Sequence, residues 1–300
     1  MFIKSWLLWI VVGIGLLAGG YPRSVDASHV GPFVADTAEP IETHKLVFQV
    51  IPSFFIKQGV YNEEGNRQYL PSGDRQNQLI TLFKPIYGLF NHFEISAEIP
   101  VQYNWLTQGN RSANDGGVGE VLLAGKYRFW ENDKNGWRPS ISGIAKVKFP
   151  SGRYEKLSEN RLGGDKTGNG SYEYWIGVNC SKFLGDWAVH LNLWYDWVAE
   201  TTVDGVRTKP GNILNYNAAV EYSFNKKFSF LLELIGLEQG KREEMNQTVE
   251  KSEVRSLALM PALGWEINEK ICLLMGCSFS LLGKNTDFGF TPALLFNYSF

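Results

Sequence analysis

Apolar and polar residues alternate along most of this chain, most clearly between Gly119 and Pro150. In the first half of that stretch, apolar residues occupy the odd-numbered positions from Val121 to Phe129, with mostly charged residues between them. The second half repeats the pattern from Ile141 to Phe149, beyond a polar turn at 131–136. Successive side chains of a strand point to opposite faces, so the pattern predicts a β-hairpin with one apolar and one charged face. Arms of about ten residues with aromatic ends suit strands that cross an outer membrane, although a soluble sheet can show the same alternation.

The alternation recurs in twelve segments along the chain. Their predicted bounds are 45–56, 77–89, 93–105, 120–129, 140–149, 171–182, 187–198, 214–224, 228–237, 255–267, 271–282 and 288–300. Long polar connections alternate with short ones, and bacterial barrels keep the long loops outside and the short turns in the periplasm. A soluble sandwich, the alternative, has no reason to sort its connections in this way. We therefore predict an all-β fold, a transmembrane antiparallel β-barrel of about 12 strands with long extracellular loops, short periplasmic turns and both termini in the periplasm.

The first residues form a unit separate from the barrel. Lys4 supplies a positive charge, Trp6 to Ala18 an apolar run, and Val25 to Ala27 a small-residue cleavage site, which together predict a secretory signal peptide over residues 1–27. An uncleaved anchor helix is the alternative, but the apolar run is shorter than the roughly 20 residues that a spanning helix needs. Residues 28–43 contain prolines and little periodicity, so we expect a periplasmic N-terminal lead-in without regular structure, followed by the barrel over 44–300.

Composition excludes several other classes of protein. A net charge of -2 gives no basic surface for nucleic acid, so we expect no nucleic-acid partner. The four histidines are widely spread and no C-x-x-C occurs, so we expect neither a metal site nor a cofactor. The three cysteines, Cys180, Cys272 and Cys277, leave at least one unpaired. Aromatic residues make up 14% of the chain, while a mean hydropathy of -0.18 is what alternating strands produce.

If the apolar faces meet lipid, the charged faces line the lumen. The candidate lumen-lining residues are Glu94, Glu98, Glu120, Lys126, Arg128, Lys146, Lys148, Glu173, His190, Asp196, Glu221 and Glu233. Counting back from the hairpin turn predicts cross-strand pairs of Arg128 with Ser140 and of Glu120 with Lys148. One interpretation is a constriction whose charges select solutes. The other is an interior simply filled with paired polar side chains.

Apolar side chains also fall on the predicted inward face. They are Leu122, Ile144, Trp175, Trp194, Leu231, Ile235, Leu274 and Leu295. Such groups among the charges suit a hydrophobic solute, and they equally suit a packed interior.

Several short blocks resemble one known family. They are Gly116-Gly117-Val118-Gly119, Lys126-Tyr127-Arg128-Phe129, Phe149-Pro150-Ser151-Gly152, the run from Ser181 to Trp187, Glu233-Leu234-Ile235-Gly236 and Met260-Pro261-Ala262-Leu263-Gly264. In this order they resemble the family of outer-membrane transporters named after the meta-pathway of phenol degradation, over roughly Phe93 to Phe300. The chain departs from that pattern at Glu120, where the family usually has Asp, and at Arg153, where it has an acidic residue. The resemblance implies an outer-membrane barrel that passes aromatic or other hydrophobic compounds.

The predicted function is an outer-membrane channel or transporter for passive uptake of small hydrophobic or aromatic compounds. A non-transporting barrel, acting as an adhesin or envelope scaffold, is the alternative. A lipid hydrolase is disfavoured and we expect no enzyme, because His190 and Asp196 lie about 20 Å apart along one strand and no Gly-x-Ser-x-Gly occurs. The expected partners are outer-membrane lipid, a small-molecule solute, and the barrel-insertion machinery, which would recognise the aromatic end at Phe300. Barrel closure removes free strand edges, so we expect a monomer.

Overall fold

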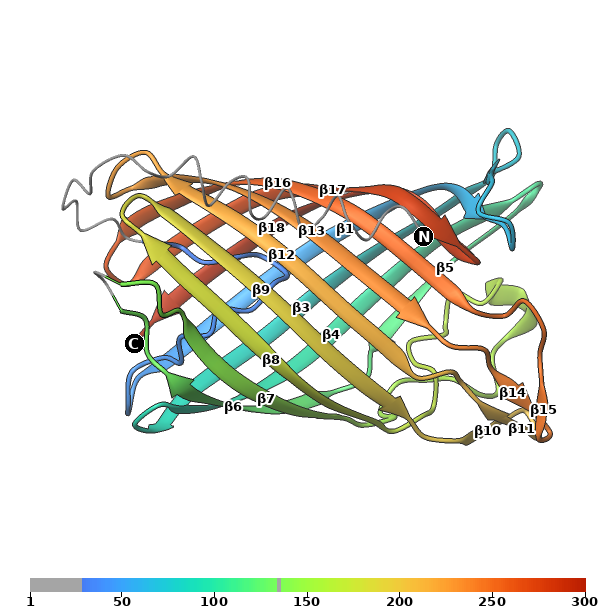
Figure 1. Ribbon diagram of the computed structural model, residues 1–300. Helices are drawn as coiled ribbons and strands as arrows, with labels where there is room; N and C mark the ends of the chain where they lie inside the picture. The colour runs from blue at the N-terminus through green and yellow to red at the C-terminus, as the bar shows by residue number, and fades with distance from the viewer. Residues whose placement is uncertain (1–28, 134–135) are drawn as a thin grey trace.

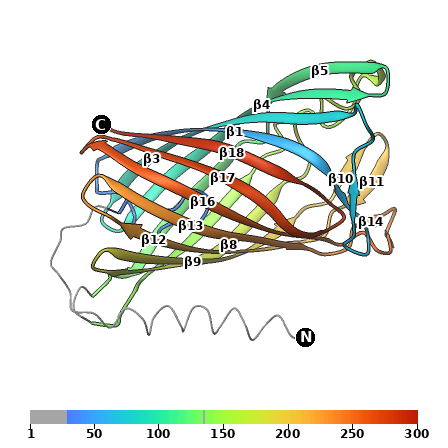
Figure 2. The ribbon, with the colours of Figure 1, turned by 90° about the horizontal axis from the view of Figure 1, so that it is seen from above.

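Twelve antiparallel strands close into a barrel in the computed structural model, which describes residues 29–133 and 136–300. In chain order the barrel strands are β1 (Leu46–Tyr61), β3 (Arg75–Phe90), β4 (Phe93–Gln108), β6 (Leu122–Trp130), β7 (Ser140–Lys148), β8 (Glu173–Leu184), β9 (Trp187–Val198), β12 (Ile213–Ser223), β13 (Phe228–Gln239), β16 (Val254–Asn268), β17 (Ile271–Lys284) and β18 (Thr286–Ser299). Each pairs with its neighbour in sequence, and β18 pairs with β1 to close the wall. The strands run obliquely around the barrel axis (Figures 1 and 2). The predicted fold class is confirmed.

The barrel wall has apolar side chains outside and polar side chains inside. Strand β9 shows this in strict alternation, with Leu191 and Leu193 exposed and with Asn192 and Asp196 buried. The pattern inverts that of a water-soluble sheet, because the outward face meets hydrocarbon while the lumen holds the polar groups. None of the described residues forms a helix long and apolar enough to span a membrane.

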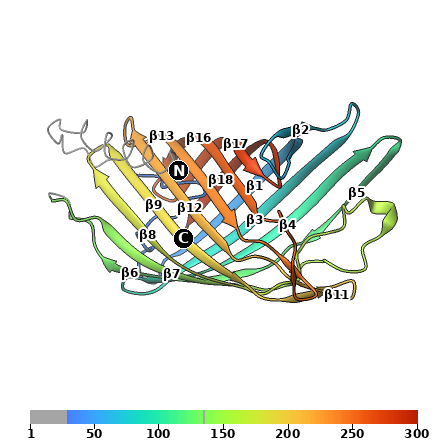
Figure 3. The same cartoon turned by 45° about the vertical axis from the view of Figure 1, so that its right-hand side comes forward.

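Connections of different lengths gather at opposite ends of the barrel. The connections at 91–92, 185–186, 224–227 and 269–270 are short, and they share one end with the C-terminus. The other end carries β2 (Arg67–Tyr69), β5 (Arg111–Val118), a 3₁₀ turn at Glu159–Arg161 and a small sheet made of β10 (Thr201–Val203), β11 (Val206–Lys209), β14 (Glu243–Glu244) and β15 (Gln247–Thr248). Figure 3 shows β5 extending well beyond the rim. Only Asn285 separates β17 from β18, so this connection is far shorter than the other extracellular ones.

The β6–β7 hairpin forms with a different register from the predicted one. Arg128 pairs with Ser142 rather than Ser140, and Lys148 pairs with Leu122 rather than Glu120. The connection is longer than the predicted turn because β6 ends at Trp130 and β7 starts only at Ser140. Lys182 Nζ supports this connection from β8 by donating to the carbonyls of Asp133 and Gly136, each at 2.7 Å.

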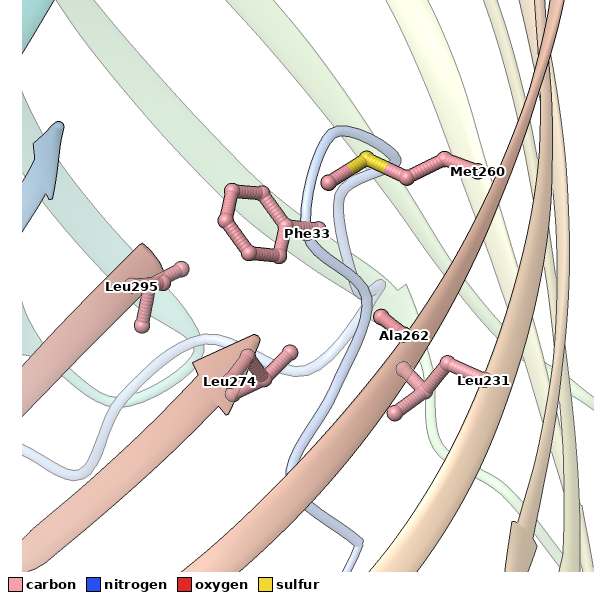
Figure 4. Close-up of a cluster of buried hydrophobic side chains, with 6 residues drawn as sticks. All are labelled: Phe33, Leu231, Met260, Ala262, Leu274 and Leu295. Atoms are coloured by element: carbon pink, nitrogen blue, oxygen red, sulfur yellow. The ribbon is translucent and has the colours of Figure 1, made fainter. Parts of the chain in front are cut away.

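The segment before β1 lies inside the barrel. We expected residues 28–43 in the periplasm, but residues 29–43 enter the lumen at the end with the short turns, without regular secondary structure. Phe33 packs in the lumen in a cluster with Leu231, Met260, Ala262, Leu274 and Leu295 (Figure 4). We call residues 29–43 the lumen segment. The predicted signal peptide, residues 1–27, lies outside the described residues.

Candidate functional site in the barrel lumen

Two buried carboxylates hold the start of the lumen segment. Glu221 accepts hydrogen bonds from the backbone N–H of Val30 at 2.9 Å and of Gly31 at 3.3 Å. Glu233 accepts from Phe33, from Val34 at 2.9 Å and from Ala35 at 3.0 Å. Both glutamates have no exposed surface, so these N–H groups replace the water that would otherwise solvate them. A segment without secondary structure thereby obtains partners for its backbone.

Polar side chains of β9, β8 and β4 fix the rest of the segment. Asn192 accepts from the N–H of Asp36 at 2.8 Å and donates to the carbonyl of Asp36 at 2.7 Å. Ser181 Oγ accepts from the N–H of Ala38 at 2.8 Å, and Glu94 accepts from the N–H of Ile41 at 2.7 Å. The segment is therefore attached to strands on both sides of the lumen.

Three basic side chains pair with acidic groups on or near the lumen segment. Lys126 Nζ lies 3.1 Å from Asp36 and 2.9 Å from Glu94. Arg128 pairs with Glu39 of the lumen segment. Lys84 on β3 lies 3.1 Å from Glu98. Three of the predicted lumen residues, Lys126, Arg128 and Glu98, thus have partners that the sequence prediction did not include. These partners are Asp36, Glu39 and Lys84.

A second cluster lies nearer the extracellular end. Lys148 Nζ is 3.0 Å from Glu120 and 2.5 Å from Glu173, so the predicted Glu120–Lys148 pair forms in spite of the shifted register. Glu120 also accepts from the N–H groups of Asn169 at 2.7 Å and Gly170 at 3.0 Å, which ties down the end of the loop at 149–172. Asp196 is fully buried, and neither of its carboxylate oxygens has a hydrogen-bond partner among the described residues.

His190 does not belong to a catalytic arrangement with Asp196. Its Nδ1 lies 2.8 Å from Ser181 Oγ, and its Nε2 has no hydrogen-bond partner within the described part of the chain. In the β8–β9 ladder, His190 pairs with Ser181 while Asp196 pairs with Trp175. Six strand residues separate the two side chains by about 20 Å, so the structure leaves them apart.

Lys146 is the predicted lumen base whose surroundings differ most from those of the others. Its Nζ lies 4.3 Å from the ring centroid of Trp194 and 5.1 Å from that of Trp175. It faces a cavity of about 630 Å³ between the lumen segment and the wall formed by β18, β1, β3, β4 and β6 to β9. The apolar side chains of that cavity include Ile80, Leu82, Ile144, Trp175, Trp194 and Leu295.

The loop at 149–172 closes the extracellular end of the wall beside the β4–β5 hairpin. Asn104 donates to the carbonyl of Gly164 at 2.6 Å, and Thr167 Oγ1 donates to the carbonyl of Val118 at 2.9 Å. Asp115 on β5 pairs with Arg161, and Arg153 lies 3.6 Å from Asp115. The backbone N–H of Gly116 and then the Arg161 guanidinium hold the pKa of the Asp115 carboxyl below its ordinary value of 3.8. The basic residue at position 153, at which the chain departs from the family pattern, thus has an acidic neighbour here.

Nine of the predicted lumen residues lie in the ion pairs near the lumen segment, in the cluster around Lys148, or in contact with the segment itself. Glu221 and Glu233 both face inward on adjacent strands that carry no inward basic residue, so the sequence indicates that they need partners from elsewhere but does not identify the lumen segment as their source. The described residues contain no group of three potential metal-ligating side chains, and Cys180, Cys272 and Cys277 are free thiols.

Residues 68–292 match the model of a protein family described as "Putative MetA-pathway of phenol degradation". Among solved structures, the COG4313 outer membrane channel from Pseudomonas putida F1 is similar with a TM-score of 0.74 and 14% identity, over 91% of this chain and 100% of that one. The translocator domain of autotransporter NalP from Neisseria meningitidis has a TM-score of 0.49 at 9% identity, over 86% of this chain and 89% of that one. The CymD monoaromatic hydrocarbon channel has a TM-score of 0.47 at 6% identity, over 87% of this chain and 89% of that one. No curated protein sequence matches the chain. The family match spans well over half of the sequence, and the chain therefore belongs to the MetA-pathway of phenol degradation family, with the fold of an outer-membrane β-barrel.

Proposed function

We propose that the chain is an outer-membrane channel for the passive uptake of small hydrophobic or aromatic compounds. The observation that carries this proposal is the lumen cavity of about 630 Å³, whose wall combines apolar side chains and two indole rings with seven charged side chains, all but Lys146 in ion pairs. Ligand sites of this kind bind an apolar body by contact and orient it by a few polar groups. Membership of a family named after phenol degradation and similarity to a protein described as an outer membrane channel support the same function.

In this proposal the lumen segment defines the route. Its residues 30–35 occupy the side of the lumen formed by β12, β13 and β16 to β18, where Glu221, Glu233 and the Phe33 cluster hold them. A solute passes between the segment and the opposite wall, past Ala124 and Lys146, which both line the cavity. The charged residues that were predicted to form a constriction then act mainly by fixing the segment and the loop at 149–172.

A non-transporting barrel is the competing function, and the lumen segment itself favours it. A segment bound by carboxylates on β13 and β4, by an amide on β9 and by its own buried phenyl ring can serve as a permanent stopper. Uptake measurements distinguish the two functions, because a stoppered barrel passes no solute.

The test is uptake of a radiolabelled monoaromatic hydrocarbon by porin-deficient cells that express the full chain. Ala124→Trp places a large ring in the cavity, and we expect uptake to fall at least severalfold toward the level of cells without the protein. Ala97→Trp is the matched control, since Ala97 alternates with the inward Glu94 and Glu98 positions and faces lipid. Equal uptake with and without the protein would support the stoppered barrel and reject the channel.

The remaining partners and processing follow from the same proposal. We infer a monomer, because β18 pairs with β1 and leaves no edge in the wall for a second copy. The exposed Phe300 ring at the C-terminus is available to the barrel-insertion machinery. We also propose removal of residues 1–27 on export and no enzymatic activity. Amino-terminal sequencing of the mature protein tests the cleavage, with Ser28 expected as its first residue.

A further inference from the structure

Lys146 differs from the other buried lysine of the lumen in having no acidic partner. Lys126 contacts two carboxylates and a carbonyl, whereas no carboxylate of the described residues lies within 4.0 Å of Lys146 Nζ. Only 8% of Lys146 is exposed, and its Nζ faces the lumen cavity rather than a carboxylate. An ammonium group carries three donors, so Lys146 can donate to a ligand in the cavity.

The acids around the cavity are already committed to other bases. Glu98 pairs with Lys84 at 3.1 Å, and Asp36 and Glu94 share Lys126. Glu39, the fourth acid at the cavity, pairs with Arg128. Lys146 is therefore the cation of the cavity that can receive an anion from outside the chain.

The two indole rings support the ammonium without satisfying it. Rings at 4.3 and 5.1 Å attract a cation through their π faces, which offer no lone pair for its N–H donors. Trp175 has a buried Nε1 without a hydrogen-bond partner among the described residues. Lys146 keeps its own donors free beside the cavity, and an anion can accept from them.

The walls of the cavity limit the rest of the ligand. Ile80, Leu82 and Ile144 supply apolar surface in the same cavity as Lys146, so the ligand's body is apolar. The four acids of the cavity disfavour a dianion, even though each is paired. These limits favour one carboxylate on a compact apolar body.

We propose that Lys146 forms a binding site for the carboxylate of a small apolar acid, such as a monoaromatic acid, inside the lumen. The proposal deepens the channel function and rests on it for its biological meaning, since it adds the anionic form to the solutes that the cavity takes. Binding itself does not require transport.

The test is calorimetric titration of the full chain in detergent, near neutral pH, with four probes. Benzoate carries the expected features, cyclohexanecarboxylate lacks the aromatic ring, benzamide is the neutral analogue, and benzylamine carries the opposite charge. We expect benzoate to bind on the order of tenfold or more tightly than benzamide, because a hydrogen bond to a charged group contributes that much. Benzylamine should not bind. Comparable binding of cyclohexanecarboxylate would identify any compact apolar acid as the ligand, and weaker binding would identify an aromatic one.

Variants then assign the effect to Lys146. Lys146→Met should abolish the preference for benzoate over benzamide, and Lys146→Arg should retain part of it. Lys148→Met is the matched control, because it removes a lumen lysine that does not line the cavity. The heat-dependent gel mobility of each variant verifies that its barrel is folded. Equal binding of benzoate and benzamide to the unmodified chain, or unchanged benzoate binding to folded Lys146→Met, would overturn the proposal.

Binding and uptake fail independently. A chain that binds benzoate through Lys146 but gives no hydrocarbon uptake retains the anion site and loses the channel function. A chain that takes up hydrocarbon and binds benzoate no better than benzamide retains the channel and loses the site.

Discussion

At the scale of single residues, charged side chains of the lumen hold the lumen segment in place as well as lining the route of a solute. Glu221 and Glu233 lie on adjacent strands, and their oxygens accept five backbone N–H groups of residues 30–35. Hydrogen bonds to a buried carboxylate are stronger than neutral ones, so two side chains hold much of an irregular segment. The Phe33 side chain adds apolar contact with the cluster around Leu231 and Met260.

Replacing Glu233 by Gln should loosen the lumen segment. The amide keeps one acceptor but presents its NH₂ donors to the N–H groups of Val34 and Ala35. We expect a loss of about 1–3 kcal/mol in docking of the segment, and so roughly fivefold to hundredfold acceleration of hydrogen exchange at residues 33–35.

Mass spectrometry of exchanged peptides measures this effect. Glu238→Gln is the control, because Glu238 is an exposed residue of the same strand. Unchanged protection of residues 33–35 in Glu233→Gln would mean that these hydrogen bonds do not hold the segment.

At the scale of elements, the β4–β5 hairpin and the loop at 149–172 are joined by charge. Asp115 contacts Arg161 and Arg153, and the pKa of its carboxyl is lower in the folded chain than in the unfolded one. A lowered folded pKa means that this contact stabilises the loop above the ordinary value of 3.8 and is lost as the pH falls through the folded value.

Acid should therefore release the loop before it disrupts the barrel. We expect amide protection in 151–170, corrected for intrinsic exchange rates, to fall on strong acidification while the strands of the wall remain protected. In Asp115→Asn the loop should be less protected at neutral pH and should lose most of this pH response. The same acid-dependent loss in Asp115→Asn would assign the response to another group.

The elements also show how far the sequence alone leads. All twelve barrel strands were predictable, because apolar and polar positions must alternate where one face meets lipid and the other the lumen. The register of β6 and β7 was not predictable. It depends on the connection between these strands, which is held by hydrogen bonds from Lys182 on β8. The position of the lumen segment was not predictable either, because residues 28–43 have no periodicity and their partners lie up to 200 positions away.

At the scale of the whole molecule, the apolar outer surface makes the barrel dependent on a membrane. Leu193 is 56% exposed in the middle of β9, and its neighbours on the outer face are also apolar. Leu193→Arg should destabilise the barrel by about 2–4 kcal/mol if this face lies near the middle of the bilayer.

Unfolding of the chain in lipid vesicles by denaturant measures that change. Val206→Arg is the comparison, because Val206 is 42% exposed on β11, in the extracellular sheet, and should tolerate the charge. Equal effects of the two substitutions would contradict the assignment of the outer face of β9 to lipid.

The attachment of the lumen segment also has a consequence for assembly. The segment leads directly into β1, and β1 forms the closing seam with β18. A barrel that closed with an empty lumen would leave Glu221 and Glu233 without their N–H partners and the pocket of Phe33 unfilled. Filling the interior therefore lowers the free energy of the closed wall, so a segment without secondary structure helps to stabilise the seam between β1 and β18.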